Sequence, residues 1–200
     1  MEEMRMFYTP LWRADFTERE PRWALMRQVL VDKIMELART EQGVAKTNFG
    51  GWQSGDDLYK HREFAWLIER IMATANEVAP QFSAQRRFDD GVMWANVNRQ
   101  YNFNAQHTHP ESVLSGVIYL KVDGEDQGVI QFFDAREGMP TNHWRCYTQL
   151  PDETELMQAV VTVAPREGTI LFFPGWLRHW VTPNLTNKDR VSVSFNLRMN

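Results

Sequence analysis

The sequence has very little cysteine and no long apolar run. Cys146 is the single cysteine among 200 residues, so the chain cannot form an internal disulfide and suits a reducing compartment. No apolar run approaches the roughly 20 residues that a helix needs to cross a bilayer. Glu2 and Glu3 stand where a secretory signal would carry positive charge. We therefore expect a soluble cytoplasmic protein that does not enter a membrane.

A strong charge of either sign is also lacking. The formal net charge is -4, which does not indicate a dedicated partner such as nucleic acid or a membrane surface. Hydrophobic residues make up 43% of the chain, enough for one domain with a sizeable core. Because no repeat, low-complexity tract or clear linker divides the sequence, we expect a single domain over residues 1–200. A homodimer is compatible with this organisation.

Helical spacing is confined to the first part of the chain. Apolar residues recur every three or four positions over Arg22–Thr40 and again over Glu63–Ala79, and Pro80 follows the second segment. The glycine-rich stretch Asn48–Asp57 between them is typical of a loop. We therefore expect residues 1–90 to form a mainly helical support.

From Gly91 onward the pattern becomes that of short β-strands separated by turn residues. We expect strands at Val92–Asn98, Val113–Val122, Val129–Asp134, Ala159–Val163, Thr169–Phe173 and Arg190–Leu197. Short strands without intervening helices favour an antiparallel barrel or sandwich. The prediction is a mainly β protein whose core is residues 91–200, with the helices packed outside.

Histidines indicate a metal site. His107 and His109 are separated by one residue, and alternate side chains of a strand point to the same face. His179, from a neighbouring strand, would complete a set of three imidazoles, which suits iron, zinc, copper or manganese. The more usual iron set has two histidines and a carboxylate. Glu111 with His109 would provide it and leave His107 out, and Asp134 is a more distant candidate, so the ligand set stays open.

The last strand predicts an anion site. Alternation puts Arg190, Ser192, Ser194 and Asn196 on one face of this strand and apolar residues on the other. The apolar face must be buried, and the helices are the expected partner. If the polar face lines the barrel interior, Arg190 needs an anionic partner there, and a guanidinium beside the Ser192 hydroxyl suits a carboxylate. The alternative is an edge strand with a solvated arginine. Tyr119 could donate to the same carboxylate or simply pack.

Together these residues resemble the 2-oxoglutarate/Fe(II)-dependent dioxygenases of the double-stranded β-helix fold. More narrowly, the chain is similar to a prolyl-hydroxylase-like family of 2-oxoglutarate oxygenases found in marine bacteria, cyanobacteria and their phages. The resemblance spans most of the chain, and its matching segments are Gly51–Ser54, His107–Pro110, Leu114–Tyr119 and Phe172–His179.

The resemblance implies that His179 is the distal iron ligand and that Arg190, with Tyr119 and Ser192, holds the far carboxylate of 2-oxoglutarate. It also implies a hydroxylase that uses Fe(II), 2-oxoglutarate and O₂, releases succinate and CO₂, and acts on a peptidyl or protein side chain. One departure matters, because His109 stands where the prolyl-hydroxylase-like pattern has an acid. Either His107, His109 and His179 hold the iron, with less negative charge around it, or Glu111 replaces the acid.

Two other classes of protein share part of this pattern. A cupin-like metal enzyme also has a His-x-His pair and a Pro-Gly before a later histidine. Cupins carry a glutamate soon after the second histidine, where this chain has Val113 and Leu114, and they give Arg190 no role. A β-helix binding module that has lost its metal is the third class.

Overall fold

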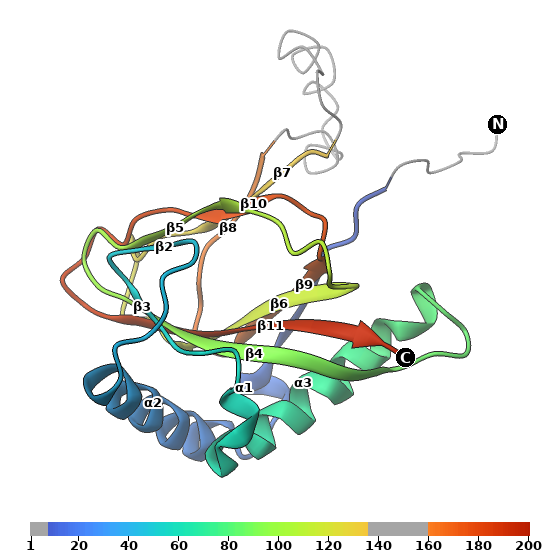
Figure 1. The fold of residues 1–200 in the computed structure, drawn as a ribbon, viewed down its shortest axis with the longest axis horizontal. Coiled ribbons are helices and arrows are strands. Elements are labelled where there is room, and N and C mark those ends of the chain that lie inside the picture. The colour runs from blue at the N-terminus through green and yellow to red at the C-terminus, as the bar shows by residue number, and fades with distance from the viewer. Residues whose placement is uncertain (1–7, 136–159) are drawn as a thin grey trace, which may run out of the picture.

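The computed structural model describes residues 8–135 and 160–200. Two antiparallel sheets lie one above the other, and the helices cover the outer face of the larger sheet (Figure 1). Cys146 lies outside the described residues. The described chain is thus arranged in three layers, with the larger sheet between the helices and the smaller sheet.

The larger sheet has six strands in the order β1-β9-β6-β11-β4-β3. The strands of this sheet, in that order, are Trp12–Asp15, Thr169–Pro174, Leu114–Lys121, Arg190–Met199, Phe88–Asn98 and Trp52–Gln53. The smaller sheet has five strands in the order β2-β5-β10-β7-β8. These are Asn48–Phe49, Phe103–His107, His179–Val181, Ile130–Phe133 and Val160–Val163.

The helices are α1 (Phe16–Arg19), α2 (Trp23–Thr40) and α3 (Ala65–Val78), with short 3-10 turns at Leu58–Lys60, Arg62–Phe64 and Ala79–Gln81. The two long helices lie within a residue or two of the predicted segments. Helix α3 ends at Val78, and Pro80 lies in the following 3-10 turn, because proline cannot continue the helical hydrogen-bond pattern.

Strand β11 divides the interior into two parts. Val191, Val193, Phe195 and Leu197 are buried in a hydrophobic cluster that also contains the apolar stripes of α2 and α3. Residues of the opposite face of β11 line a cavity between the sheets. A second, smaller apolar cluster lies between the sheets and includes Val117, Tyr119, Phe132, Leu171 and Phe173. The predicted burial of the apolar face of β11 against the helices is confirmed.

The structure differs from the sequence prediction mainly in its shortest elements. Strands β1, β2 and β3 come from the first 90 residues, which were expected to be helical and loop. Strands β2 and β3 have two residues each, too few to show a period of two. The predicted strand Thr169–Phe173 is β9, which ends at Pro174 in the larger sheet, and His179 begins β10 in the smaller one.

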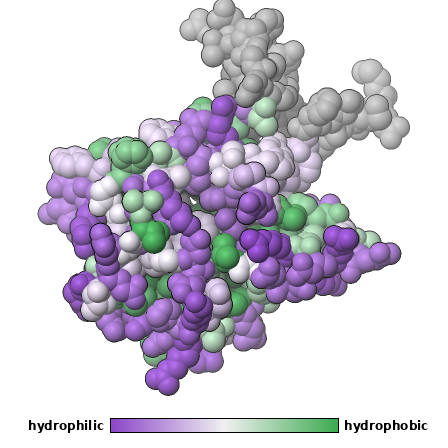
Figure 2. Space-filling model, viewed as in Figure 1, coloured by the Kyte–Doolittle hydropathy of each residue, from purple (hydrophilic) through white to green (hydrophobic). Residues whose placement is uncertain are grey.

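One face of the molecule is mainly polar. Figure 2 shows one face, on which hydrophilic side chains predominate and apolar groups form small, scattered patches. Within residues 8–135 and 160–200, no helix is both long and apolar enough to span a membrane. The apolar side chains of the two clusters are instead withdrawn into the interior.

Replacement of Phe195 by alanine tests the packing of β11 on the helices. Phe195 is fully buried, and its ring lies 5.3 Å from that of Phe172. We expect Phe195→Ala to lower the free energy of unfolding by about 3–5 kcal/mol in denaturant titration, because a large cavity is left. Arg198→Ala, on the same strand with an exposed ion pair to Asp90, should cost less than about 1 kcal/mol. Equal losses would contradict this packing.

Candidate metal centre

Three histidines from different segments converge in the cavity between the sheets. His107 ends β5 and His179 begins β10, and the two are directly paired across these antiparallel strands. One ligand nitrogen from each of His107, His109 and His179 lies within 4.8 Å of the others. Neither Glu111, which is exposed, nor Asp134 belongs to this group. The described residues contain no other such cluster of histidine, cysteine or carboxylate groups.

His109 reaches the group from a turn, not from a strand as the sequence suggested. Strand β5 ends at His107, and the His109 N–H donates to the Gly175 carbonyl at 2.7 Å. A Cβ on Gly175 would lie 2.6 Å from the His109 carbonyl and 2.3 Å from that of Ser112. Only glycine therefore permits the two turns to approach this closely. The Pro-Gly turn after β9 thus helps to place His109.

Backbone carbonyls orient two of the three rings. The Nδ1 atom of His107 lies 2.7 Å from the Ala105 carbonyl, and that of His179 lies 2.8 Å from the Leu177 carbonyl. Because a carbonyl only accepts, each Nδ1 must carry the proton, which leaves the Nε2 lone pair free. Both rings therefore have the tautomer that a metal ligand requires.

The third ring has an amide partner. Asn196 Nδ2 lies 3.3 Å from Nδ1 of His109, and Asn196 Oδ1 accepts from the Ser115 hydroxyl at 2.8 Å. The two ends of an amide are assigned from their hydrogen bonds, and a hydroxyl can either donate or accept. The reversed amide would therefore also satisfy Ser115, and it would accept from His109 Nδ1. In that orientation all three rings present Nε2.

Burial keeps the three rings neutral. It lowers the pKa of His179 to about 3, with a further lowering by His107, and the pKa of His109 to about 4, again with a contribution from His107. It also lowers the pKa of His107, against the opposing effect of the Ala105 carbonyl. At neutral pH the cluster therefore has no charge of its own and presents lone pairs, the form that binds a cation.

The predicted anion-binding residues lie in the same cavity. Arg190 is only 2% exposed, and its Nη1 donates to the Gln127 and Gly128 carbonyls at 2.8 and 3.1 Å. Its Nε has no hydrogen-bond partner, and among the described residues it forms no ion pair. Burial lowers the pKa of this guanidinium, and nearby Tyr119 opposes the shift. A buried positive charge without a carboxylate is costly, so the site is suited to an anion.

Tyr119 and Ser192 are neighbours of this guanidinium. They are directly paired across β6 and β11, and both line the cavity with Arg190. Burial raises the pKa of Tyr119, which Arg190 opposes, so the phenol keeps its proton and can donate. The sequence prediction had grouped these three residues, and the structure brings them together.

The cavity joins the histidine cluster to Arg190 and has a volume of about 280 Å³. Part of its wall was not predicted from the sequence. This part consists of Lys46, Thr47, Gln53, Asp56, Trp94, Asn96 and Asn104. The alternation of Trp94, Asn96 and Asn98 with small apolar residues on β4 was a usable signal, because it matches that of β11. The glycine-rich loop Asn48–Asp57 could have been an active-site lid on sequence grounds, but nothing in its chemistry required the segments around β2 and β3 to reach the cavity.

Comparisons with known proteins agree with this site. A model of the family described as "Putative 2OG-Fe(II) oxygenase" matches residues 92–196, just over half of the 200 residues. A search of curated proteins finds no sequence that matches. Solved structures with a similar fold have low sequence identity to this chain.

A prolyl-4-hydroxylase from Pseudomonas putida is 14% identical, with a TM-score of 0.62 over 95% of this chain and 92% of that one. The epimerase SnoN of nogalamycin biosynthesis, solved with Fe³⁺, α-ketoglutarate and nogalamycin RO, is 15% identical, with a TM-score of 0.63 over 94% and 79% of the two chains. A prolyl hydroxylase from Trichoplax adhaerens, in complex with a hypoxia-inducible-factor peptide, is 8% identical, with a TM-score of 0.63 over 94% and 82%.

These neighbours confirm the predicted double-stranded β-helix fold, with few helices outside the sheets. The family match adds the cofactors, which are iron(II) and 2-oxoglutarate with dioxygen. The three-histidine cluster and the unpaired guanidinium fit those two groups. The chain belongs to the family of 2OG-Fe(II) oxygenases.

Proposed function

We propose that the protein binds iron(II) through His107, His109 and His179. The observation that supports this set is the convergence of their ligand nitrogens within 4.8 Å, together with carbonyl partners that leave Nε2 free on two of the rings. Glu111 is exposed and outside the group, which favours the three-histidine set over the mixed set. Three neutral ligands leave the full charge of the cation to be balanced by an anionic cosubstrate.

We also propose that Arg190, with Tyr119 and Ser192, holds the far carboxylate of 2-oxoglutarate. The single observation that carries this proposal is the buried guanidinium with an unpartnered Nε and no ion pair among the described residues. A carboxylate would supply the missing charge and the missing acceptor together. The Tyr119 phenol and the Ser192 hydroxyl add neutral donors on the same cavity wall.

Aromatic rings pack against the histidine cluster. Phe173 and Phe132 lie 4.8 and 5.9 Å from the His179 ring, centroid to centroid, and Trp94 lies 5.8 Å from that of His109. Iron, 2-oxoglutarate and dioxygen supply the oxidation, which yields succinate and CO₂ and transfers one oxygen atom to a substrate C–H bond. The chain itself orients the cosubstrate through Arg190 and keeps the histidines neutral and fixed.

We propose a peptidyl or protein side chain as the substrate class. Two similar structures are prolyl hydroxylases, and one of them was solved with a peptide. The cavity wall on the side of Lys46, Gln53, Asp56 and Trp94 carries charged, amide and aromatic groups, which suit a polar chain with hydrogen-bonding groups of its own. Mass spectrometry of candidate peptides after incubation would detect the gain of one oxygen atom.

Anaerobic addition of Fe(II) and 2-oxoglutarate tests the activity itself. We expect a weak visible charge-transfer band from the chelated iron, and succinate from 2-oxoglutarate once air is admitted. His179→Ala should lose both signals, because His179 belongs to either ligand set. A wild-type protein that gives neither a band nor succinate would refute the oxygenase assignment for this chain.

Metal content distinguishes the two ligand sets. Loss of a partner that only orients a metal ligand already lowers affinity by roughly 10–100-fold, so loss of a ligand should lower it at least as much. We therefore expect His107→Ala to weaken Fe(II) binding by more than about tenfold, measured by competition with a chelator. Glu111→Ala should leave the affinity within about twofold, since its side chain is exposed. The opposite pattern would establish the mixed set.

Arg190→Met tests the carboxylate site. Loss of one partner of a buried charge pair costs about 2–5 kcal/mol, so the Kd for 2-oxoglutarate should rise by at least about 30-fold. Fe(II) affinity should be unchanged, because Arg190 is not in the histidine cluster. Arg198→Met is the matched control, on the same strand but exposed, and should bind 2-oxoglutarate normally. Parallel loss of metal and 2-oxoglutarate would mean that Arg190 is structural.

A further inference from the structure

Two loops meet beside Arg190 and are joined by hydrogen bonds. Residues 122–129 connect β6 to β7, and residues 182–189 connect β10 to β11. The backbones of the two loops pair directly, since the Leu185 N–H donates to the Asp126 carbonyl at 2.7 Å and the Thr182 N–H donates to the Val129 carbonyl at 2.9 Å. The second loop leads straight into Arg190, so the position of that residue depends on this junction.

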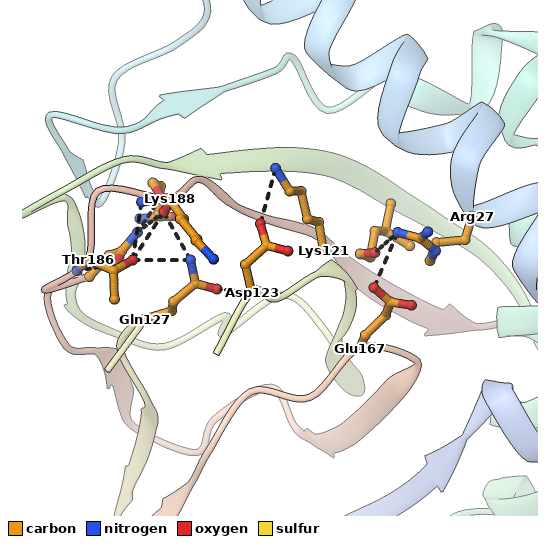
Figure 3. Close-up of polar contacts among 10 residues, drawn as sticks. Arg27, Lys121, Asp123, Gln127, Glu167, Thr186 and Lys188 are labelled. Atoms are coloured by element: carbon orange, nitrogen blue, oxygen red, sulfur yellow. Dashed lines mark hydrogen bonds and ion pairs between the residues drawn. The ribbon is translucent and has the colours of Figure 1, made fainter. Parts of the chain in front are cut away.

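Gln127 is the side chain that spans the junction. It is 1% exposed, its Oε1 accepts from the Asp123 N–H at 2.7 Å, and its Nε2 donates to the Lys188 carbonyl at 2.9 Å and to the Thr186 hydroxyl at 3.3 Å. Figure 3 shows this side chain between its own loop and the loop that carries Thr186 and Lys188. The amide therefore has acceptor and donor partners on opposite sides.

The main chain of the same residue holds the guanidinium. Arg190 Nη1 donates to the carbonyls of Gln127 and Gly128, so two successive carbonyls share one nitrogen. Among the described residues these are the only hydrogen bonds of the guanidinium, and Nε stays without a partner. Gln127 thus fixes the loop with its side chain and orients Arg190 with its carbonyl.

Gly128 permits the second carbonyl contact. Its φ is +81°, and a Cβ there would lie 2.3 Å from the Thr182 carbonyl oxygen and 3.0 Å from Arg190 Nη1. Any other residue would push the two loops and the guanidinium apart. The two neighbouring residues therefore have different roles. Gln127 links the two loops through its side chain, and Gly128 allows Arg190 to approach the backbone.

This arrangement matters because an arginine side chain has several rotatable bonds and a planar donor fork. Holding one nitrogen on two carbonyls fixes the plane of the guanidinium before any ligand arrives, and the other donors stay available. A fork that is oriented in advance loses less conformational entropy on binding a carboxylate. Release of the Gln127 carbonyl would restore that freedom and weaken binding, although the Gln127 side chain itself does not line the cavity.

We propose that Gln127 is a positioning residue that sets the affinity for 2-oxoglutarate through Arg190. This inference rests on the proposed function, because it assumes that Arg190 binds the cosubstrate carboxylate. The competing explanation is that Gln127 only stabilises the two loops. The two explanations differ in one measurable respect: a positioning residue acts on 2-oxoglutarate affinity only while Arg190 is present.

A double-mutant cycle distinguishes the positioning role of Gln127 from a purely structural one. The variants are Gln127→Met, which keeps the side-chain volume but removes every side-chain hydrogen bond, Arg190→Met, and the pair together. The Kd for 2-oxoglutarate is measured anaerobically with Fe(II) by the visible band. We expect Gln127→Met alone to raise the Kd about tenfold, as for a weakened charge-assisted hydrogen bond. In the Arg190→Met background it should change the Kd by less than about twofold, because coupled residues are not additive.

Gln131→Met is the matched control, because Gln131 also bridges two segments, through Thr162 and Trp180, but does not contact Arg190. It should leave the Kd unchanged, and all the variants should keep Fe(II) affinity. If Gln127→Met does not fold, Gln127→Asn enters the same cycle, because it stays uncharged and its amide is one methylene too short to keep its partners on both loops. An equal change in both backgrounds, or no change in the first, would overturn the inference alone. Failure of the wild type to bind 2-oxoglutarate would overturn the proposed function and this inference with it.

Discussion

The positive charge of Arg190 lies inside the barrel, 2% exposed, and no carboxylate among the described residues neutralises it. A buried charge of this kind lowers the stability of a protein unless a ligand completes the pair. The carbonyls of Gln127 and Gly128 satisfy only one of its nitrogens. Since the three histidines at the other end of the cavity are kept neutral by burial, the site as a whole is short of negative charge.

Strand β11 makes the fold and the site parts of one arrangement. Its apolar side chains lie in the cluster with the helices, and its polar side chains line the cavity. The free energy gained by burying Val191, Val193 and Phe195 therefore also holds Arg190 and Ser192 in place. A shift of one residue in the register would turn every polar group toward the helices, so the packing that stabilises the domain also fixes the chemistry.

Much of the fold could be predicted from the sequence, because the helical and the strand periodicities of the apolar residues are both strong. The helices α2 and α3, the long strands and the two faces of β11 follow from spacing alone, whereas the grouping of Tyr119 with Arg190 and Ser192 came from the resemblance to the family. Contacts between distant loops could not be predicted. His109 lies in a turn held by Gly175, and Gln127 contacts Arg190 through its backbone carbonyl. Each of these contacts joins two segments that are far apart in the sequence, so the residue spacing within one segment does not reveal it. The single-domain and homodimer predictions stay predictions.

The central claim is that one cavity holds iron on three histidines and a carboxylate on Arg190. A crystal structure determined anaerobically with Fe(II) and 2-oxoglutarate tests it most directly. We expect the metal bonded to His107, His109 and His179, and the far carboxylate of 2-oxoglutarate paired with the Arg190 guanidinium beside Tyr119. Iron bound by Glu111 in place of His107, or a 2-oxoglutarate molecule whose far carboxylate lies away from Arg190, would contradict the account.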